Sequence, residues 1–179
     1  MLDRNQAVLV VIDIQGKLAT LMYEKERLFA NVKRMIHAAK LLHIPILWTE
    51  QLPDKLGETA PEIKEALTDA NVIVKKHFSC WPNEEFRTEL EKLGRKQILV
   101  TGIETHICVY QTVMDLLKSK FDVNVVIDAV SSRLEHNYHL AVQKMNDAGA
   151  TLTSVEMSLF EMFEVAEGEE FREIIKIVK

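Results

Sequence analysis

The sequence has few cysteines, no long hydrophobic run and no excess of basic charge. Its 179 residues include two cysteines, Cys80 and Cys108, too few for a disulfide framework and not spaced as paired metal ligands. The formal net charge of -5 gives no electrostatic footprint for nucleic acid or anionic membrane surfaces. The apolar stretch near the N-terminus lacks the length of a membrane span and the layout of a signal peptide. We therefore expect a cytoplasmic protein that binds neither nucleic acid nor membranes.

Length and composition indicate one globular domain. A chain of 179 residues can bury a substantial core, and 47% hydrophobic with 27% charged residues is typical of soluble globular proteins. We find no internal repeat, linker or low-complexity tract. We expect a single domain over residues 1–179.

Short apolar runs alternate with segments whose apolar residues recur at helical spacing. The run at residues 7–12 is continuous and β-branched, as in a strand buried on both faces. Strands that alternate with helices indicate right-handed βαβ units, so we expect a three-layer α/β/α, Rossmann-like fold with a six-stranded parallel sheet. The other predicted strands are 44–49, 72–74, 98–100, 123–127 and 151–155; the predicted helices are 26–42, 62–67, 84–93, one through Cys108 to 117, 134–148, 159–163 and 169–177. Residues 50–61 are predicted to form a loop, because they are rich in helix and strand breakers.

The segment QILVTGIETHICVYQTVMDLL, residues 97–117, combines a buried strand with the helix that follows it. Cys108 falls in the first turn of that helix, where the helix dipole favours a thiolate. Most free cysteines, however, are small buried hydrophobes without chemistry. The position alone leaves both interpretations open.

Two further polar residues stand at strand ends. Asp13 follows the first predicted strand and Lys75 follows the third, and in open parallel sheets ligands bind beyond these carboxyl ends. Singly, Asp13 is explained as a helix cap and Lys75 as a solvated side chain. Together with Cys108 they supply an acid, a fixed cation and a nucleophile, as covalent attack on a carbonyl or imine carbon requires.

Three motifs carry a family resemblance: VVIDIQ at 10–15, KKHFS at 75–79 and GIETHICV at 102–109. The pattern resembles the isochorismatase-like cysteine hydrolases over nearly the whole chain. Segments 49–53, 56–59 and 128–133 look most like the isochorismatase-domain-containing proteins, whose members mostly lack an assigned substrate. The resemblance implies the strand order 3-2-1-4-5-6, a homo-oligomer and an Asp-Lys-Cys triad at Asp13, Lys75 and Cys108. Lys75 is preferred to Lys76 because it lies four residues before Ser79, as in the family.

The resemblance also implies a cis peptide bond between Ile103 and Glu104, and an oxyanion hole formed by the backbone N-H groups of Glu104 and Cys108. Glu104 departs from the family, since many catalytic relatives have a small residue there. Its carboxylate either selects a cationic or hydrogen-bond-donating substrate or points into solvent.

Six residues near the expected site are candidates to line a substrate pocket: Gln15, Glu50, Phe78, Trp81, Glu104 and His106. Aromatic residues after a strand more often belong to the core, and His77 and His106 are more often packing or surface residues than ligands. The nicotinamidases of this superfamily carry an Asp and two His after the second strand, whereas this chain has Glu50, Gln51 and Asp54 there. We therefore expect no metal and no cofactor.

The hypothesis that follows is a cysteine hydrolase acting on a small amide or related C-N bond through a thioester-type intermediate. Two alternatives remain open. One is a binding or scaffold protein that keeps the fold without turnover. The other is a redox-sensing thiol protein, for which Cys80 is the candidate resolving cysteine.

Overall fold

The computed structural model of the protein describes residues 1–68, 70–163 and 165–179. Its centre is a six-stranded sheet in which every neighbouring pair of strands is parallel, in the order β3-β2-β1-β4-β5-β6. The predicted sheet and its strand order are confirmed. The strands are β1 (Ala7–Ile12), β2 (Ile46–Gln51), β3 (Val72–Lys75), β4 (Gln97–Ile103), β5 (Asp122–Ser131) and β6 (Thr151–Thr153).

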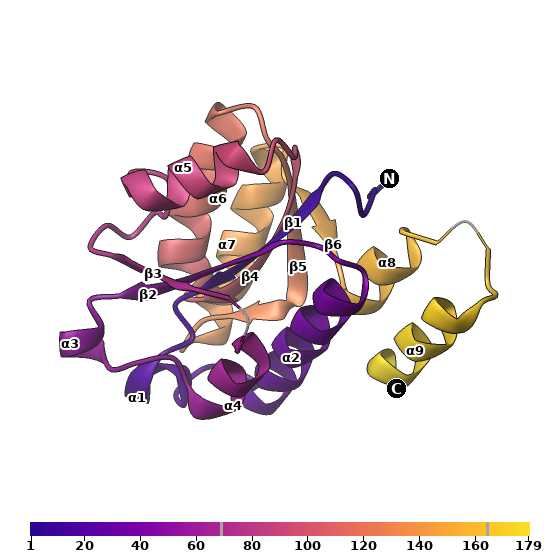
Figure 1. Cartoon of the computed structure of the whole chain (residues 1–179). Coiled ribbons are helices and arrows are strands. Elements are labelled where there is room, and N and C mark those ends of the chain that lie inside the picture. Colours follow the sequence, from indigo (N-terminus) through magenta and orange to yellow (C-terminus); the bar gives the residue numbers. More distant parts are fainter. Residues whose placement is uncertain (69, 164) are drawn as a thin grey trace.

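Helices cover both faces of this sheet (Figure 1). One layer contains α2 (Lys25–Leu41), α8 (Val155–Phe160) and α9 (Glu169–Val178). The other contains α5 (Glu84–Lys92), α6 (Tyr110–Lys118) and α7 (Glu135–Asp147). Shorter elements are α1 (Gly16–Ala19), α3 (Pro53–Leu56), α4 (Pro61–Lys64), a 3-10 turn (Glu65–Leu67) and a π-helical turn (Thr105–Val109).

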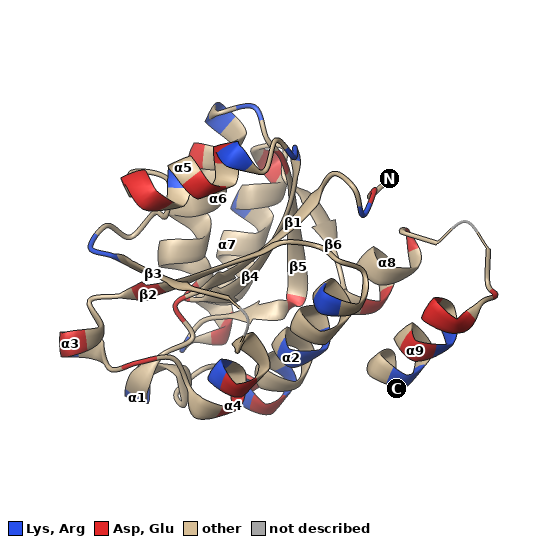
Figure 2. Cartoon of the chain, viewed as in Figure 1, with Lys and Arg blue, Asp and Glu red and all other residues tan. Residues whose placement is uncertain are grey.

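Strand β1 shows why the sheet needs two helical layers. Leu9 and Val11 pack into the core cluster under α2, while Val10 and Ile12 pack into the cluster under α6. All four side chains are at most 1% exposed, so each contributes roughly 1.5 to 3 kcal/mol of burial free energy. Charged residues of both signs lie instead along the outer helices α2, α4, α5 and α9 (Figure 2).

Several predicted boundaries are wrong. The helix predicted at 159–163 lies at Val155–Phe160, and the strand predicted at 44–49 lies at Ile46–Gln51. Strand β5 continues past residue 127 to Ser131, because a register shift between Val100 and Gly102 lets the end of β4 pair with it again. The loop at 50–61 contains the helix α3, which tolerates its proline because Pro53 stands at the first position. Val155 begins α8 instead of ending the sixth strand, and the Ser154 side chain caps that helix.

Gly102 allows the carboxyl ends of β1 and β4 to approach closely. Its φ is 122°, and a Cβ there would lie 2.1 Å from the carbonyl oxygen of Ile12. This contact holds Asp13 next to the chain segment that leads to Cys108. The candidate site lies at this end of the sheet.

Among the helices that the structure describes, none has both the length and the apolar character needed to cross a membrane.

Candidate active site

The three residues predicted to form a triad come from the ends of three strands. Asp13 directly follows β1, Lys75 is the last residue of β3, and Cys108 lies in the π-helical turn after β4. Lys75 pairs in register with Gln51 of β2, the strand between β3 and β1, and its side chain crosses the end of β2 to reach Asp13. The neighbouring Lys76 is exposed.

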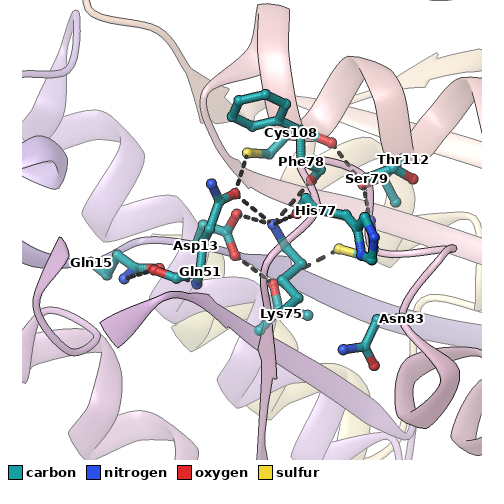
Figure 3. A network of polar contacts seen from close by, with 12 residues as sticks. Asp13, Gln15, Gln51, Lys75, His77, Phe78, Ser79, Asn83, Cys108 and Thr112 are labelled. Atoms are coloured by element: carbon teal, nitrogen blue, oxygen red, sulfur yellow. Dashed lines mark hydrogen bonds and ion pairs between the residues drawn. The ribbon is translucent and has the colours of Figure 1, made fainter. Parts of the chain in front are cut away.

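A buried ion pair forms the centre of the site (Figure 3). Lys75 Nζ lies 2.6 Å from Asp13 Oδ2, and the two side chains are 0% and 6% exposed. The ammonium also donates to Gln51 Oε1 and to the carbonyl oxygens of His77 and Phe78, each at 3.0 Å. The other Asp13 oxygen accepts a hydrogen bond from Thr49 Oγ1 at 2.8 Å. Because both charges are paired and hydrogen-bonded, the pair can persist without water.

Burial by itself lowers the pKa of Lys75, but the neighbouring Asp13 carboxylate and, less strongly, Cys80 and Cys108 raise it overall. Lys75 is therefore a fixed cation at neutral pH. Its charge can stabilise an anion beside it without leaving its own place.

The Cys108 thiol differs from the expected thiolate. Burial raises its pKa well above the ordinary range, the Asp13 carboxylate raises it further, and Lys75 only partly opposes them. The residue is 8% exposed and sits in a π-helical turn instead of the first turn of an α-helix. This direction is opposite to the one that the helix-dipole argument predicts, and it favours a neutral thiol in the resting site.

Gln51 belongs to the site, although it was not among the predicted site residues. Its side-chain oxygen accepts hydrogen bonds from Cys108 Sγ at 3.3 Å and from Lys75 Nζ at 3.0 Å. Figure 3 shows the amide between the thiol and the ammonium. The sequence feature that could have identified Gln51 is its position at the end of β2, the strand that the Lys75 side chain crosses to reach Asp13.

A cavity of about 130 Å³ opens in front of the thiol. Of the predicted pocket residues, Gln15, Phe78 and Glu104 line it. The lining consists of Asp13, Gln15, Leu18, Gln51, Leu56, Phe78, Ile103, Glu104, Ile107 and Cys108. A larger hollow of about 530 Å³ lies at the opposite end of β2 and β3, and no triad residue borders it.

Three predicted pocket residues lie outside this cavity. The Glu50 carboxylate is used internally, because it accepts hydrogen bonds from Thr59 N at 2.6 Å and Thr59 Oγ1 at 2.7 Å. Trp81 packs edge-on against Phe121, with ring centroids 5.6 Å apart. The His106 side chain contacts the segment between β5 and α7, where its Nδ1 lies 2.9 Å from Ser132 Oγ. Each finds a packing or hydrogen-bond partner that local sequence does not reveal.

Gln15 fixes the loops around the cavity. Its Nε2 donates to the carbonyl oxygens of Gln51 at 2.9 Å and Gly57 at 2.7 Å, and its Oε1 accepts from Gln51 N at 2.6 Å. The side chain thereby joins the end of β1 to the segment after β2. Its amide is fully used within the protein, so Gln15 shapes the cavity.

Glu104 also lines the cavity. The peptide bond between Ile103 and Glu104 is cis. The Glu104 N-H has no hydrogen-bond acceptor among the residues that the structure describes, so it is free to donate to a ligand. The carboxylate Oε1 accepts from Arg133 N at 3.1 Å and Arg133 Nε at 2.9 Å.

Within the described part of the chain, no three His, Cys, Asp or Glu side chains are grouped as metal ligands. The chemistry that the site offers is that of a thiol, a carboxylate, an ammonium and the backbone N-H of Glu104.

Known proteins are similar to this chain in both sequence and fold. Residues 7–157 match the Isochorismatase domain family. The secreted isochorismatase effector Isc1 of Phytophthora sojae is 38% identical over 98% of this chain and 85% of its own length. Isochorismatase domain-containing protein 2A of Mus musculus is 35% identical over 98% of this chain and 84% of its own length.

Two solved structures have nearly the same fold. The MAR1 ribonuclease of Caenorhabditis elegans is 34% identical, with a TM-score of 0.92 over 99% of this chain and 91% of its own. The YcaC gene product of Escherichia coli, described as an octameric hydrolase of unknown specificity, is 27% identical, with a TM-score of 0.92 over 98% of this chain and 89% of its own.

Proposed function

The chain belongs to the isochorismatase family, and from this we propose that it is a cysteine hydrolase that cleaves a small amide or related C-N bond. One observation carries the proposal: a thiol at the wall of a cavity is joined through Gln51 to a buried Asp13-Lys75 ion pair. A nucleophile beside a base that is itself held in place is the arrangement that covalent catalysis requires.

In the first step the thiol loses its proton as it attacks. Because the pKa of Cys108 is raised by burial, proton transfer to Asp13 accompanies formation of the bond between sulfur and the carbonyl carbon. The carbonyl electron pair moves to oxygen, where the N-H groups of Glu104 and Cys108 serve as donors. One well-placed donor of this kind is worth about 3 kcal/mol in the transition state.

In the second step the tetrahedral intermediate collapses. The C-N bond breaks, the leaving nitrogen takes the proton from Asp13, and a thioester on Cys108 remains. Water then attacks the thioester and gives a proton to Asp13. The sulfur-carbon bond breaks, Asp13 returns that proton to sulfur, and the products are a carboxylic acid and an amine or ammonia.

Lys75 acts through charge and position throughout this cycle. Its ammonium keeps the Asp13 carboxylate in place and ready to accept a proton. When Asp13 is protonated, three other oxygen acceptors still hold the ammonium. Lys75 therefore need not exchange its own proton.

A screen of small primary amides and ureides, read out by ammonia release, tests the proposal. Cys108→Ala should abolish release, while Cys80→Ala, which removes the other thiol, should retain it. Mass spectrometry of the intact protein during turnover should show an acyl adduct on Cys108. Release that persists in Cys108→Ala contradicts the proposed nucleophile.

The scaffold alternative makes the opposite prediction: no amide is hydrolysed and no acyl adduct forms. The redox alternative has little structural support, because Cys80 is 0% exposed and both cysteines are free. Reversible disulfide formation between them under mild oxidation would favour it.

The C. elegans neighbour is named a ribonuclease, so RNA is a further class of substrate to test. The net charge of -5 and the small cavity favour a small molecule, because RNA binding relies on basic contacts to phosphates. Degradation of RNA that is lost in Cys108→Ala would contradict a small-molecule substrate.

We also propose that the protein forms a homo-oligomer and works in the cytoplasm. The E. coli neighbour is described as octameric, which supports assembly, and a reduced Cys108 suits a reducing compartment. The Phytophthora relative is named as secreted, so location has to be tested by fractionation of the native cells. Light scattering of the purified protein tests the assembly.

A further inference from the structure

Glu104 lines the cavity, and one of its two carboxylate oxygens has no hydrogen-bond partner among the described residues. The side chain is 4% exposed, and both hydrogen bonds from Arg133 go to Oε1. No described residue donates to Oε2. Among the described residues, Thr105 Oγ1 is the one side-chain oxygen that is both buried and without a partner, so Glu104 Oε2 must be partly accessible to solvent. Oε2 is therefore free to accept a hydrogen bond from a ligand.

The cavity lining contains a second acidic residue and no basic one, so the Glu104 carboxylate matters for the charge of the ligand. Asp13 and Glu104 both line the cavity, and its ten lining residues include no Lys, Arg or His. The Lys75 ammonium lies behind Asp13 and is used by four oxygen acceptors. Arg133, half-exposed, reaches Glu104 from outside the lining. An anionic ligand would find acceptors and no cation in this cavity.

The remaining wall is apolar and the space is small. Leu18, Leu56, Phe78, Ile103 and Ile107 supply the apolar surface. The volume of about 130 Å³ is well below the roughly 300 to 1,000 Å³ of sites for drug-sized ligands. Only a small group with a short apolar part fits next to the thiol.

We infer that Glu104 sets the substrate class of the proposed hydrolase: small, neutral or cationic amide-type compounds with N-H donors next to the reacting carbon and a short apolar substituent. Such a donor pairs with Oε2 of Glu104, while a substrate carboxylate at the same place would bring two acceptor oxygens together with no hydrogen-bond donor between them. The inference rests on the proposed site but adds a selection rule that the proposed chemistry does not contain.

Alkylation of Cys108 tests this rule without any turnover. Iodoacetamide and iodoacetate have nearly the same size and react alike, since sulfur displaces iodide and the thiol proton passes to solvent. They differ in carrying an amide or a carboxylate. The rate constant for iodoacetamide is divided by the rate constant for iodoacetate, both measured at pH 8.5 in the Cys80→Ala background. This ratio is then divided by the same ratio for a small neutral thiol.

For the protein with Glu104 intact, this normalised ratio should be at least about tenfold in favour of iodoacetamide, since juxtaposed like charges cost more than the roughly 1.4 kcal/mol that corresponds to tenfold. Glu104→Gln should bring it to within about threefold of unity, mainly by speeding the reaction with iodoacetate. An unchanged ratio in Glu104→Gln overturns the inference.

Arg133→Met is the matched control. It removes the guanidinium but keeps the backbone N-H that also holds Glu104 Oε1, so the carboxylate stays and the ratio should be retained or increased. If Glu104 has only a structural role, both variants should slow both reagents and leave the ratio unchanged. That result contradicts the inference.

A measurement on the unmutated protein covers the case in which Glu104→Gln does not fold. Propionamide should slow alkylation of Cys108 by iodoacetamide, and propionate at the same concentration should not. Equal protection by both compounds overturns the inference. Because neither assay needs hydrolysis, loss of the hydrolase proposal in the ammonia screen and loss of this selection rule are separate results.

Discussion

The side-chain oxygen of Gln51 accepts a hydrogen bond from the Cys108 thiol, with Sγ 3.3 Å away. The same oxygen accepts a hydrogen bond from Lys75 at 3.0 Å. Gln51 thus holds the nucleophile and the buried cation in a common arrangement, and neither contact depends on a flexible surface side chain. The precision of the site depends on this amide as much as on the ion pair.

Gln51→Leu should lower kcat of the proposed hydrolysis by about 10- to 100-fold, because the thiol and ammonium lose their shared acceptor and small displacements of reacting groups are costly. The measurement is steady-state kinetics on an amide found in the ammonia screen. Gln111→Ala, at an exposed position of α6, is the control and should leave kcat unchanged. A raised KM with unchanged kcat would mean that Gln51 only binds substrate.

Lys75→Met should lower the free energy of unfolding by about 3 to 5 kcal/mol, because it leaves the Asp13 carboxylate buried without its partner. Urea denaturation at pH 7 measures the loss. Adding Asp13→Asn should restore part of it, since the unpaired charge is then gone. Lys92→Met breaks an exposed pair with Glu89 and should cost at most about 1 kcal/mol. Equal costs for both lysine variants would contradict a buried ion pair.

Alkylation of Cys108 by iodoacetamide should be slow at neutral pH and should accelerate with pH. Because burial raises the pKa of the thiol, the rate should rise about tenfold per pH unit between pH 7 and 9 without a plateau. The rate is followed by mass spectrometry, which should find Cys80 unmodified in the folded protein because that side chain is fully buried. A plateau near neutral pH would show a thiolate in the resting site.

Alkaline conditions should destabilise the protein through Cys80. Burial raises the pKa of this thiol to about 11 from an ordinary 9.0. Between these values the thiol loses its proton in the unfolded chain and keeps it in the folded one. The contribution of Cys80 to the free energy of unfolding is therefore fully present below pH 9 and is lost as the pH rises to 11. The loss is on the order of 3 kcal/mol.

Denaturation curves at pH 8 and pH 11 should therefore differ less in Cys80→Ala than in the unmodified protein. Lysines and tyrosines titrate in both proteins and cancel in the comparison. Equal pH dependence in the two proteins would show that Cys80 keeps an ordinary pKa.

The sequence predicted the sheet because its strands are buried on both faces and read as continuous apolar runs. Such a run also locates its own carboxyl end, and this is why the amino-acid pattern alone identifies Asp13 and Lys75 as site candidates. The π-helical turn could not be predicted, because the sequence around Cys108 fits ordinary helical spacing. The direction of the Cys108 pKa shift could not be predicted either, because it follows from burial, which depends on the whole fold.

Contacts between distant segments account for the other differences. Arg133 binds Glu104, which lies 29 positions away in the sequence, and Trp81 packs against Phe121 from a distant part of the chain. Gln51 enters the site because β2 lies between β1 and β3, so its role depends on strand order as much as on its own chemistry. Local sequence patterns do not predict such long-range contacts.

The two glycines beside the cavity limit how its shape can change. A Cβ on Gly16 would lie 1.8 Å from the carbonyl oxygen of Leu56, and one on Gly57 would lie 3.0 Å from Gly16 Cα. The backbones of α1 and α3 therefore pack directly against each other beside Leu18 and Leu56, which line the cavity. Remodelling either loop alone would break this contact. New substrate preferences in related chains should therefore arise by exchanging the side chains at these two leucines, while the loops that carry them keep their length.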